Sequence, residues 1–168
     1  MKICSIWQDW RSRRSTWRSW PLIAFVIPCL IACAGAPPAA PPPPLKVAVS
    51  AAADINPDAR QRPSPVTVRV YLLKSVAAFS SADFLSLFSK EQATLGADLL
   101  QKEEFQIRPG EKMQLSLTVP NEAKHIAVMG AFRDVARAQW RDTQLVSATD
   151  PGWSVHLSGR NVQLIQSP

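Results

Sequence analysis

Cysteine is almost absent from this sequence, and its distribution limits what can hold the fold together. The chain of 168 residues has three cysteines, Cys4, Cys29 and Cys33, all within the first 33 positions. A domain formed by the rest of the chain therefore cannot contain an internal disulfide, so apolar burial has to stabilise it. A chain of roughly 120 residues is long enough to bury such a core.

Histidine and glycine are also scarce, which argues against several kinds of active site. His125 and His156 are the only histidines and form no HxH or HExxH pattern, so we predict no metal site and no cofactor. Ser154 lies two positions before His156, but no GxSxG motif accompanies the pair. Glu103 and Glu104 would point to opposite faces of a strand. With six glycines and no phosphate loop, the sequence favours a protein that is not an enzyme.

The positive charge is concentrated near the N-terminus. The whole chain has a net charge of +6, but from Cys33 onward there are 14 basic and 12 acidic residues, a net charge of +2. The excess belongs to a segment that we expect to be removed. The basic composition therefore does not indicate a nucleic-acid partner.

The first 32 residues are organised like a bacterial export signal. Residues 1–20 are basic, and residues 21–32 (PLIAFVIPCLIA) are apolar and uncharged. This run is shorter than the roughly 20 residues of a membrane-spanning helix. We therefore predict a cleaved signal peptide over residues 1–32 in preference to an uncleaved anchor.

The end of this segment resembles the lipobox of bacterial lipoprotein precursors, in the residues Leu30-Ile31-Ala32-Cys33. The resemblance implies cleavage before Cys33 and lipidation of Cys33. Ala34 follows, where an aspartate would resemble an inner-membrane retention signal, so the outer membrane is favoured. One acyl chain binds a membrane only marginally, and the several chains that the lipoprotein pathway attaches would make the anchor durable.

Residues 33–44 follow as a proline-rich segment that contains APPAAPPPP. Such a run favours extended polyproline II and would span on the order of 35 Å between Cys33 and Leu45. We predict a semi-rigid tether, in preference to a ligand for a proline-binding domain, because the run directly follows the lipid site.

From Leu45 to the end of the sequence, residues 45–168 read as a mainly β domain. Large apolar residues occupy every second position from Leu45 to Ser50 (Leu45, Val47, Val49) and again from Val66 to Leu73 (Val66, Val68, Val70, Leu72). Further strands are predicted at Glu104 to Arg108, Met113 to Val119, Ile126 to Phe132, Trp153 to Leu157 and Val162 to Ile165. About seven strands of this kind favour a two-sheet β-sandwich, with Trp140 and Trp153 packed in or near its core.

A small helical insertion interrupts the strands. We expect Ser80 to cap a helix whose buried face carries Phe84, Leu85, Leu87 and Phe88. A second helical stretch is predicted between Glu91 and Leu100. The segment from Asp54 to Pro65 (DINPDARQRPSP) is instead a turn-rich loop, and it is either a binding surface or a solvated connection.

An ordered set of motifs runs through the chain from Leu45 onward. Its segments are Ile55-Asn56-Pro57, Pro65 to Leu73, Phe79 to Leu87, Leu95 to Leu100, Arg108 to Glu111, Ile126 to Asp134 and Trp140-Arg141. No single motif is diagnostic, but the set covers most of the chain from Leu45. In its order, and in its place below a lipobox, it resembles the TssJ outer-membrane lipoproteins of type VI secretion systems.

The resemblance implies a transthyretin-like two-sheet sandwich with added helices. It also implies an anchoring role at the outer membrane in the trans-envelope complex, with TssM and, through it, TssL. The family's contact with the periplasmic C-terminal domain of TssM maps to the loop from Asp54 to Ser64. The implied contact residues are Asn56, Pro57, Asp58, Ala59, Arg60, Gln61 and Arg62.

Two alternatives remain at this point. The first is a transthyretin-like periplasmic carrier of a small ligand, which a closed apolar interior would contradict. The second is a lipid-anchored hydrolase, which would need a polar cleft around Ser154 and His156.

Overall fold

The computed structural model describes residues 44–147 and 149–167. The predicted signal peptide, Cys33 and all of the tether except Pro44 lie outside the described residues. Within the described part, none of the helices has the length and apolarity needed to cross a membrane.

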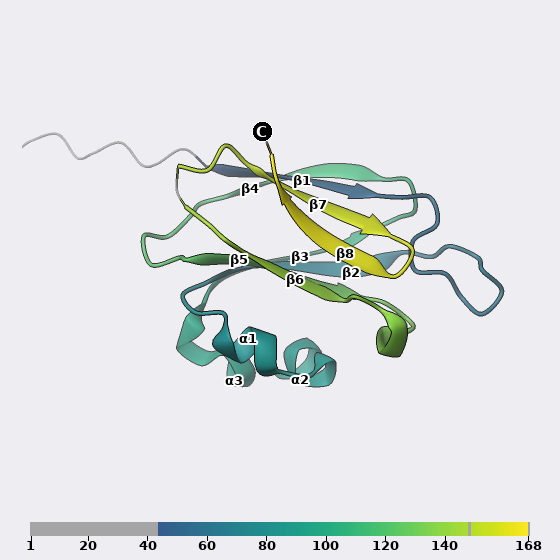
Figure 1. Ribbon diagram of the computed structural model, residues 1–168, viewed down its shortest axis with the longest axis horizontal. Helices are drawn as coiled ribbons and strands as arrows, with labels where there is room; N and C mark the ends of the chain where they lie inside the picture. Colours follow the sequence, from purple (N-terminus) through teal and green to yellow (C-terminus); the bar gives the residue numbers. More distant parts are fainter. Residues whose placement is uncertain (1–43, 148, 168) are drawn as a thin grey trace, which may run out of the picture. The chain divides into compact units, whose positions relative to one another are not determined.

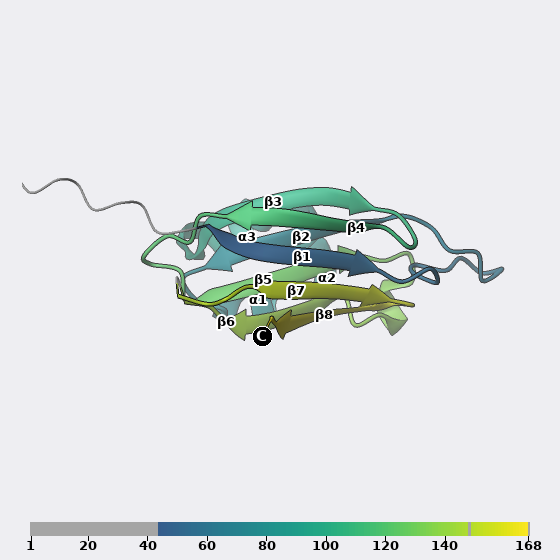
Figure 2. The ribbon, with the colours of Figure 1, turned by 90° about the horizontal axis from the view of Figure 1, so that it is seen from above.

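The domain is a sandwich of two four-stranded sheets. Sheet A has the order β4-β1-β7-β8, and sheet B has the order β3-β2-β5-β6 (Figures 1 and 2). All neighbouring strands are antiparallel except β1 and β7, which run parallel. The strands are β1 (Leu45–Ala51), β2 (Val66–Leu73), β3 (Leu99–Ile107), β4 (Lys112–Leu117), β5 (His125–Ala131), β6 (Arg141–Leu145), β7 (Trp153–Ser158) and β8 (Asn161–Gln166).

A layer of short helices covers the outer face of sheet B (Figure 1). These helices lie between β2 and β3 in sequence, and they comprise α1 (Ala77–Ser81), α2 (Phe84–Ser89), α3 (Glu91–Leu95) and the 3₁₀ turn η1 (Gly96–Asp98). A second 3₁₀ turn, η2 (Val135–Arg137), lies between β5 and β6.

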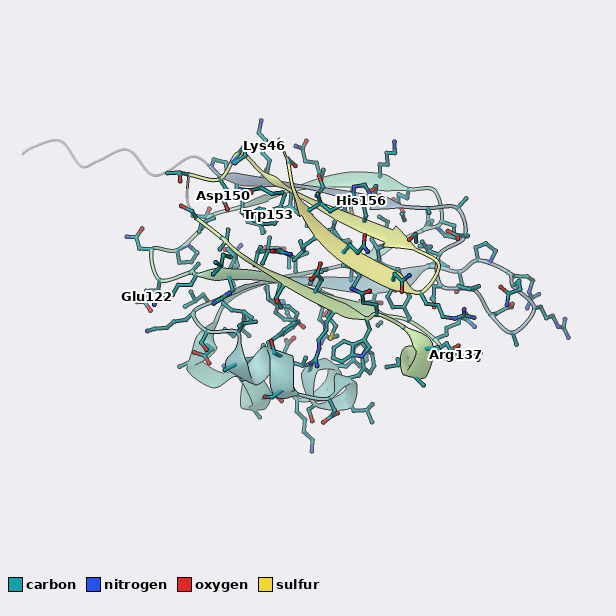
Figure 3. The ribbon with its side chains drawn as sticks, in the orientation of Figure 1. Lys46, Glu122, Arg137, Asp150, Trp153 and His156 are labelled. Carbon is teal, nitrogen blue, oxygen red and sulfur yellow. The ribbon has the colours of Figure 1, made fainter. Side chains whose placement is uncertain are left out.

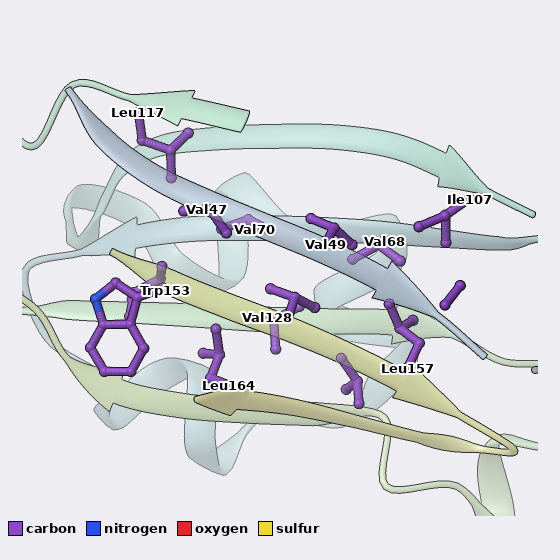
Figure 4. Packing of buried hydrophobic residues seen from close by; sticks show 14 of the residues in the cluster. Val47, Val49, Val68, Val70, Ile107, Leu117, Val128, Trp153, Leu157 and Leu164 are labelled. Atoms are coloured by element: carbon purple, nitrogen blue, oxygen red, sulfur yellow. The ribbon is translucent and has the colours of Figure 1, made fainter. Parts of the chain in front are cut away.

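The main core lies between the two sheets (Figure 4). Val47 and Val49 of β1 face Val68 and Val70 of β2 across this space, and all four are at most 1% exposed. Burying a side chain of this size contributes about 1.5–3 kcal/mol relative to leaving it in water. Trp153 is also in this core, and Trp140 packs against it, as predicted.

A second core lies between sheet B and the helices, so β2 is buried on both faces. Tyr71 and Leu73 point away from the sandwich and pack with Phe79, Leu87 and Leu95. This explains the sequence VTVRVYLL, in which Val66, Val68, Val70 and Leu72 face the first core, whereas Tyr71 and Leu73 face the second.

Arg69 connects the helices to sheet B through a nearly buried polar network. Its guanidinium bonds to Glu104 at 2.7 Å and to Glu91 at 3.2 Å, and it donates to the carbonyl oxygen of Phe88 at 2.9 Å. Glu91 also accepts from the Tyr71 hydroxyl and pairs with Lys102. The burial of Arg69 is compatible with its charge because its donors have partners.

The helical insertion differs from its prediction in two respects. Asp83, not Ser80, caps α2, because its carboxylate accepts from the backbone N–H of Ser86, whereas Ser80 lies inside α1. Leu85 and Phe88 were expected to be buried but are 69% and 38% exposed. The helix is only six residues long, and of its residues Leu87 is buried in the second core while Phe84 packs partly buried against it.

Two strand assignments also change. The segment Leu99–Gln101, which we expected to be partly helical, forms the start of β3, where it pairs with β2. β6 was not predicted, because RDTQL has no apolar alternation, and its position is determined by pairing with β5.

Candidate partner-binding surface

One end of the sandwich is built from three loops that are hydrogen-bonded to one another. They are the β1–β2 loop (residues 52–65), the β5–β6 connection (residues 132–140) and the β7–β8 turn (residues 158–161). The β1–β2 loop projects beyond the ends of the sheets (Figures 1 and 2). It is the loop that was predicted to bind a partner.

Asn56 joins the three loops and is only 3% exposed. Its side-chain amide donates to the carbonyl oxygen of Pro65 at 2.7 Å, and its side-chain oxygen accepts from the backbone N–H of Arg133 at 2.8 Å. Its own backbone N–H donates to Gly159 at 2.7 Å. Asn56 adopts a φ of 48°, a left-handed conformation that asparagine tolerates better than most residues. It therefore holds the base of the loop.

Asp58 organises the loop tip, which we define as residues 58–62. Its carboxylate accepts from the backbone N–H groups of Arg60 and Arg62, at 2.8 and 3.0 Å, and pairs with the Arg62 guanidinium at 2.7 Å. The backbone bond from Arg62, followed by the side-chain bond from Arg62, lowers the pKa of Asp58. The tip is thus a closed turn that presents its remaining side chains outward.

Within the loop tip, Ala59, Arg60, Gln61 and Arg62 are exposed. Asp58 and the preceding Pro57 are half-buried. Of the seven residues predicted to bind a partner, Asn56 has a buried side chain with a structural role, and the other six retain at least partial exposure.

A polar depression lies beneath the loop tip, and we name it the arginine basin. Arg137 and Arg160 both approach the carboxylate of Asp134, at 2.9 and 3.2 Å, and Arg133 donates from Nε to Ser64 at 3.0 Å. The basin is lined by Pro57, Asp58, Ala59, Arg133, Asp134, Arg137 and Arg160. Sequence reasoning missed this surface because its arginines are far from the loop in the chain.

The structure does not bring together Ser154 and His156, the pair that the hydrolase alternative would need. The hydroxyl of Ser154 bonds to Ser167 at 3.1 Å, whereas the Nδ1 atom of His156 bonds to Ser50 at 2.8 Å. His156 lies on the open outer face of sheet A (Figure 3), and no carboxylate within the described residues bonds to it. A Ser–His pair without an orienting acid on an open face is not an arrangement that activates a nucleophile.

The described residues also give no support to a metal site or a carrier. Residues 44–147 and 149–167 contain no group of three histidine, cysteine or acidic side chains that could hold a metal ion. The space between the sheets is filled by apolar side chains such as Val128, Leu157 and Leu164 (Figure 4). The interior is therefore a packed core, which counts against a small-ligand carrier.

Comparison with known proteins identifies the family. Residues 43–165 match the model of the type VI secretion lipoprotein family described as VasD, EvfM, TssJ. No curated protein sequence gives a match. The crystal structure of the lipoprotein TssJ1 from Pseudomonas aeruginosa is similar, with 31% identity over 76% of this chain and 98% of that chain and a TM-score of 0.72.

Two further structures have the same fold. A chain from a structure described as the TssM C-terminal domain from EAEC is 25% identical over 74% of this chain and 99% of that chain, with a TM-score of 0.62. Serratia marcescens Lip, a membrane-bound component of the type VI secretion system, is 23% identical over 76% of this chain and 100% of that chain, with a TM-score of 0.65, and a likeness at this identity shows the fold alone.

These findings confirm the resemblance that the sequence motifs indicated, and they confirm the mainly β sandwich with a small helical insertion. The family is a structural, non-enzymatic part of the type VI secretion membrane complex, so the hydrolase alternative is excluded. The chain belongs to the TssJ family of type VI secretion lipoproteins.

Proposed function

We propose that this lipoprotein is anchored in the outer membrane and faces the periplasm. The support is the lipobox-like sequence ending at Cys33, with a signal peptide over residues 1–32 and the proline-rich tether over residues 33–44. In this proposal the lipid on Cys33 holds the chain at the membrane, and the tether carries the sandwich domain of residues 45–168, whose transthyretin-like topology is the one that the resemblance implies.

The partner in this proposal is the periplasmic C-terminal domain of TssM, and TssL is joined to the complex through it. One of the similar chains comes from a structure described as the TssM C-terminal domain, which supports a relation between the two proteins. The binding residues are Pro57, Asp58, Ala59, Arg60, Gln61 and Arg62, with Asn56 fixing the loop from below.

The closed loop tip is the observation that carries this proposal. Asp58 already binds both the backbone and the side chain of Arg62, so the loop loses little conformational freedom when it docks. Arg60 has no ion-pair partner within the described residues, so its guanidinium is available to a carboxylate or a backbone oxygen of the partner.

The test replaces residues 59–62 by a short Gly-Ser segment in the full-length lipoprotein. We expect an unchanged circular dichroism spectrum, at least a tenfold loss of affinity for the purified TssM domain, and reduced secretion. The control variant carries Lys124→Ser at the opposite end of the sandwich, on an exposed side chain. If the loop variant is folded and binds as tightly as the parent, the loop is only a connection.

A further inference from the structure

The β1–β2 loop is one part of a larger composite surface. Asn56 bonds to Arg133 and to Gly159, and Arg133 bonds to Ser64, so three separate segments of the chain are held in one arrangement. A partner that reaches the loop tip therefore also meets η2 and the β7–β8 turn. Arg137, on η2, lies at the end of the sandwich from which the loop projects (Figure 3).

The charges in this surface do not balance. Arg60 and Arg62 of the loop tip, together with Arg133, Arg137 and Arg160 of the basin, contribute five guanidinium groups. Against them stand three carboxylates, Asp54, Asp58 and Asp134, and Asp54 accepts from the backbone N–H of Gly159 in the β7–β8 turn. Asp58 is already engaged by the loop tip, and Asp134 is shared between two arginines. The basin thus has donors in excess of acceptors.

The individual arginines also retain unused donors. The Nε atom of Arg160 is buried and lies 3.2 Å from Asp134, but it has no hydrogen-bond partner of suitable geometry within the described residues. The side chain of Arg137 is 78% exposed and uses Nε for Asp134. A guanidinium has five N–H donors, so each arginine can bind a second acceptor.

We propose that the arginine basin binds a carboxylate side chain of the protein partner that docks on the loop tip. This inference rests on the proposed function and adds to it a second contact, made by Arg133, Arg137 and Arg160. Paired N–H groups of arginine match the geometry of a carboxylate. Because the positive charges exceed the negative ones by two, the attraction of the arginines for one aspartate or glutamate of the partner outweighs its repulsion by Asp134.

The test measures binding of the full-length lipoprotein, in neutral detergent, to the purified TssM periplasmic C-terminal domain. Arg137→Glu should weaken binding about tenfold or more at low salt, and Arg137→Lys, which keeps the charge, should weaken it less. Lys124→Glu is the matched control, since it makes the same charge change on an exposed side chain at the opposite end of the domain. The loss caused by Arg137→Glu should shrink as salt is raised, because screening weakens exposed charge pairs.

A charge-swap experiment identifies the partner group. Replacing the correct aspartate or glutamate of the TssM domain by arginine should weaken binding to the parent and restore binding to the Arg137→Glu variant. Restoration by one acidic position and not by the others supports the proposal.

The possible outcomes separate this inference from the function on which it rests. If the parent does not bind the domain, the proposed function is wrong, and the proposed carboxylate contact is wrong as well. If the parent binds but Arg137→Glu costs no more than Lys124→Glu, the basin is not part of the interface, and the loop alone carries binding. If Arg137→Glu instead changes only the attachment of the lipoprotein to phosphatidylglycerol vesicles, the basin binds lipid phosphate and the proposal is overturned.

Discussion

The carboxylate of Asp142 accepts a hydrogen bond from the backbone N–H of Leu164 at a distance of 2.7 Å. Asp142 belongs to β6, the edge strand of sheet B, and Leu164 belongs to β8, the edge strand of sheet A. The backbone N–H of Val162 is satisfied in a similar way, by the carbonyl oxygen of Gln139 at 3.0 Å. The two sheets are therefore joined along this side, and donors that would attract another strand are occupied.

Asp142→Ala should destabilise the domain by about 1–3 kcal/mol, because it leaves the N–H of a buried residue without its acceptor. Urea denaturation of residues 45–168 is the measurement. Gln144→Ala, on an exposed residue of the same strand, should change the free energy of unfolding by less than about 0.5 kcal/mol. Equal effects of the two substitutions would show that the Asp142 bond does not stabilise the sandwich.

Leu85 and Leu87 provide a matched pair in helix α2. Leu87 is fully buried against Tyr71 and Phe79, whereas Leu85 is 69% exposed. Leu87→Ala should cost about 2–5 kcal/mol of folding free energy, and Leu85→Ala less than about 0.5 kcal/mol. Both substitutions replace leucine by alanine in the same helix and so alter the intrinsic helix propensity equally. The difference between the urea midpoints of the two variants therefore reports the difference in burial. A larger loss for Leu85 would mean that the helix is rotated relative to this arrangement.

Tyr71 is the only tyrosine in the chain, and its burial leads us to expect a loss of stability at alkaline pH. Its burial raises the pKa of its hydroxyl far above the ordinary value of 10.0. Below about pH 10 the hydroxyl is neutral in both the folded and the unfolded chain, so its contribution is fully present. Above that pH the unfolded chain ionises first, so stability falls by up to about 1.4 kcal/mol per pH unit.

The absorbance of tyrosinate tests this directly, because there is a single tyrosine to observe. It should increase together with unfolding and not before it. In Tyr71→Phe, the free energy of unfolding should fall less steeply above pH 10, because this variant lacks the group that ionises. At neutral pH the substitution should lower the free energy of unfolding by about 1 kcal/mol, through the lost hydrogen bond to Glu91. Ionisation of Tyr71 near pH 10 in the folded protein would contradict the prediction.

Strands with a large apolar residue at every second position could be predicted from the sequence. Elements whose position depends on partners far away in the chain could not. The alternation from Val66 to Leu73 predicted β2 correctly, because Val66, Val68, Val70 and Leu72 form one continuous apolar face of the strand. The short strand β6 has no such pattern, since its residues are only half-buried or exposed. Asp83 and Ser80 are both good capping residues, and only the packing of α1 and α2 decides between them.

The candidate surface, too, could be predicted from the sequence only in part. The proline content of the β1–β2 loop and its family position identified it from sequence alone. Arg133, however, is separated from Asn56 by 77 positions, and Arg137 and Arg160 lie still further along the chain. No local pattern indicates that they gather below the loop. The pairing of β2 with β5 brings Arg133 and Arg137 there, and the pairing of β1 with β7 brings Arg160.

Cys33→Ser should abolish lipidation, because Cys33 is the cysteine of the lipobox-like sequence, where we propose that the lipid is attached, and serine has no thiol. Metabolic labelling with a clickable fatty acid is the measurement, and Cys29→Ser serves as the control. We expect label on the parent and on the control and none on Cys33→Ser, which should also no longer be found in the outer-membrane fraction. Retention of label by Cys33→Ser would place the acceptor elsewhere.

Asn56→Asp tests whether the buried base of the loop determines binding at its exposed tip. Aspartate has almost the same shape as asparagine and tolerates the same backbone conformation, and it can still accept from the N–H of Arg133. It cannot donate to the carbonyl oxygen of Pro65, so two acceptors would face each other at a buried position.

We expect this substitution to cost about 1–3 kcal/mol of stability and to weaken binding to the TssM domain without altering any residue of the tip. The measurements are urea denaturation and calorimetry with the purified domain. Asn56→Gly is the comparison, since it permits the same φ but removes both side-chain bonds, and it should weaken binding as well. If both variants are less stable yet bind as tightly as the parent, the tip keeps its conformation through Asp58 alone, and Asn56 serves only the fold.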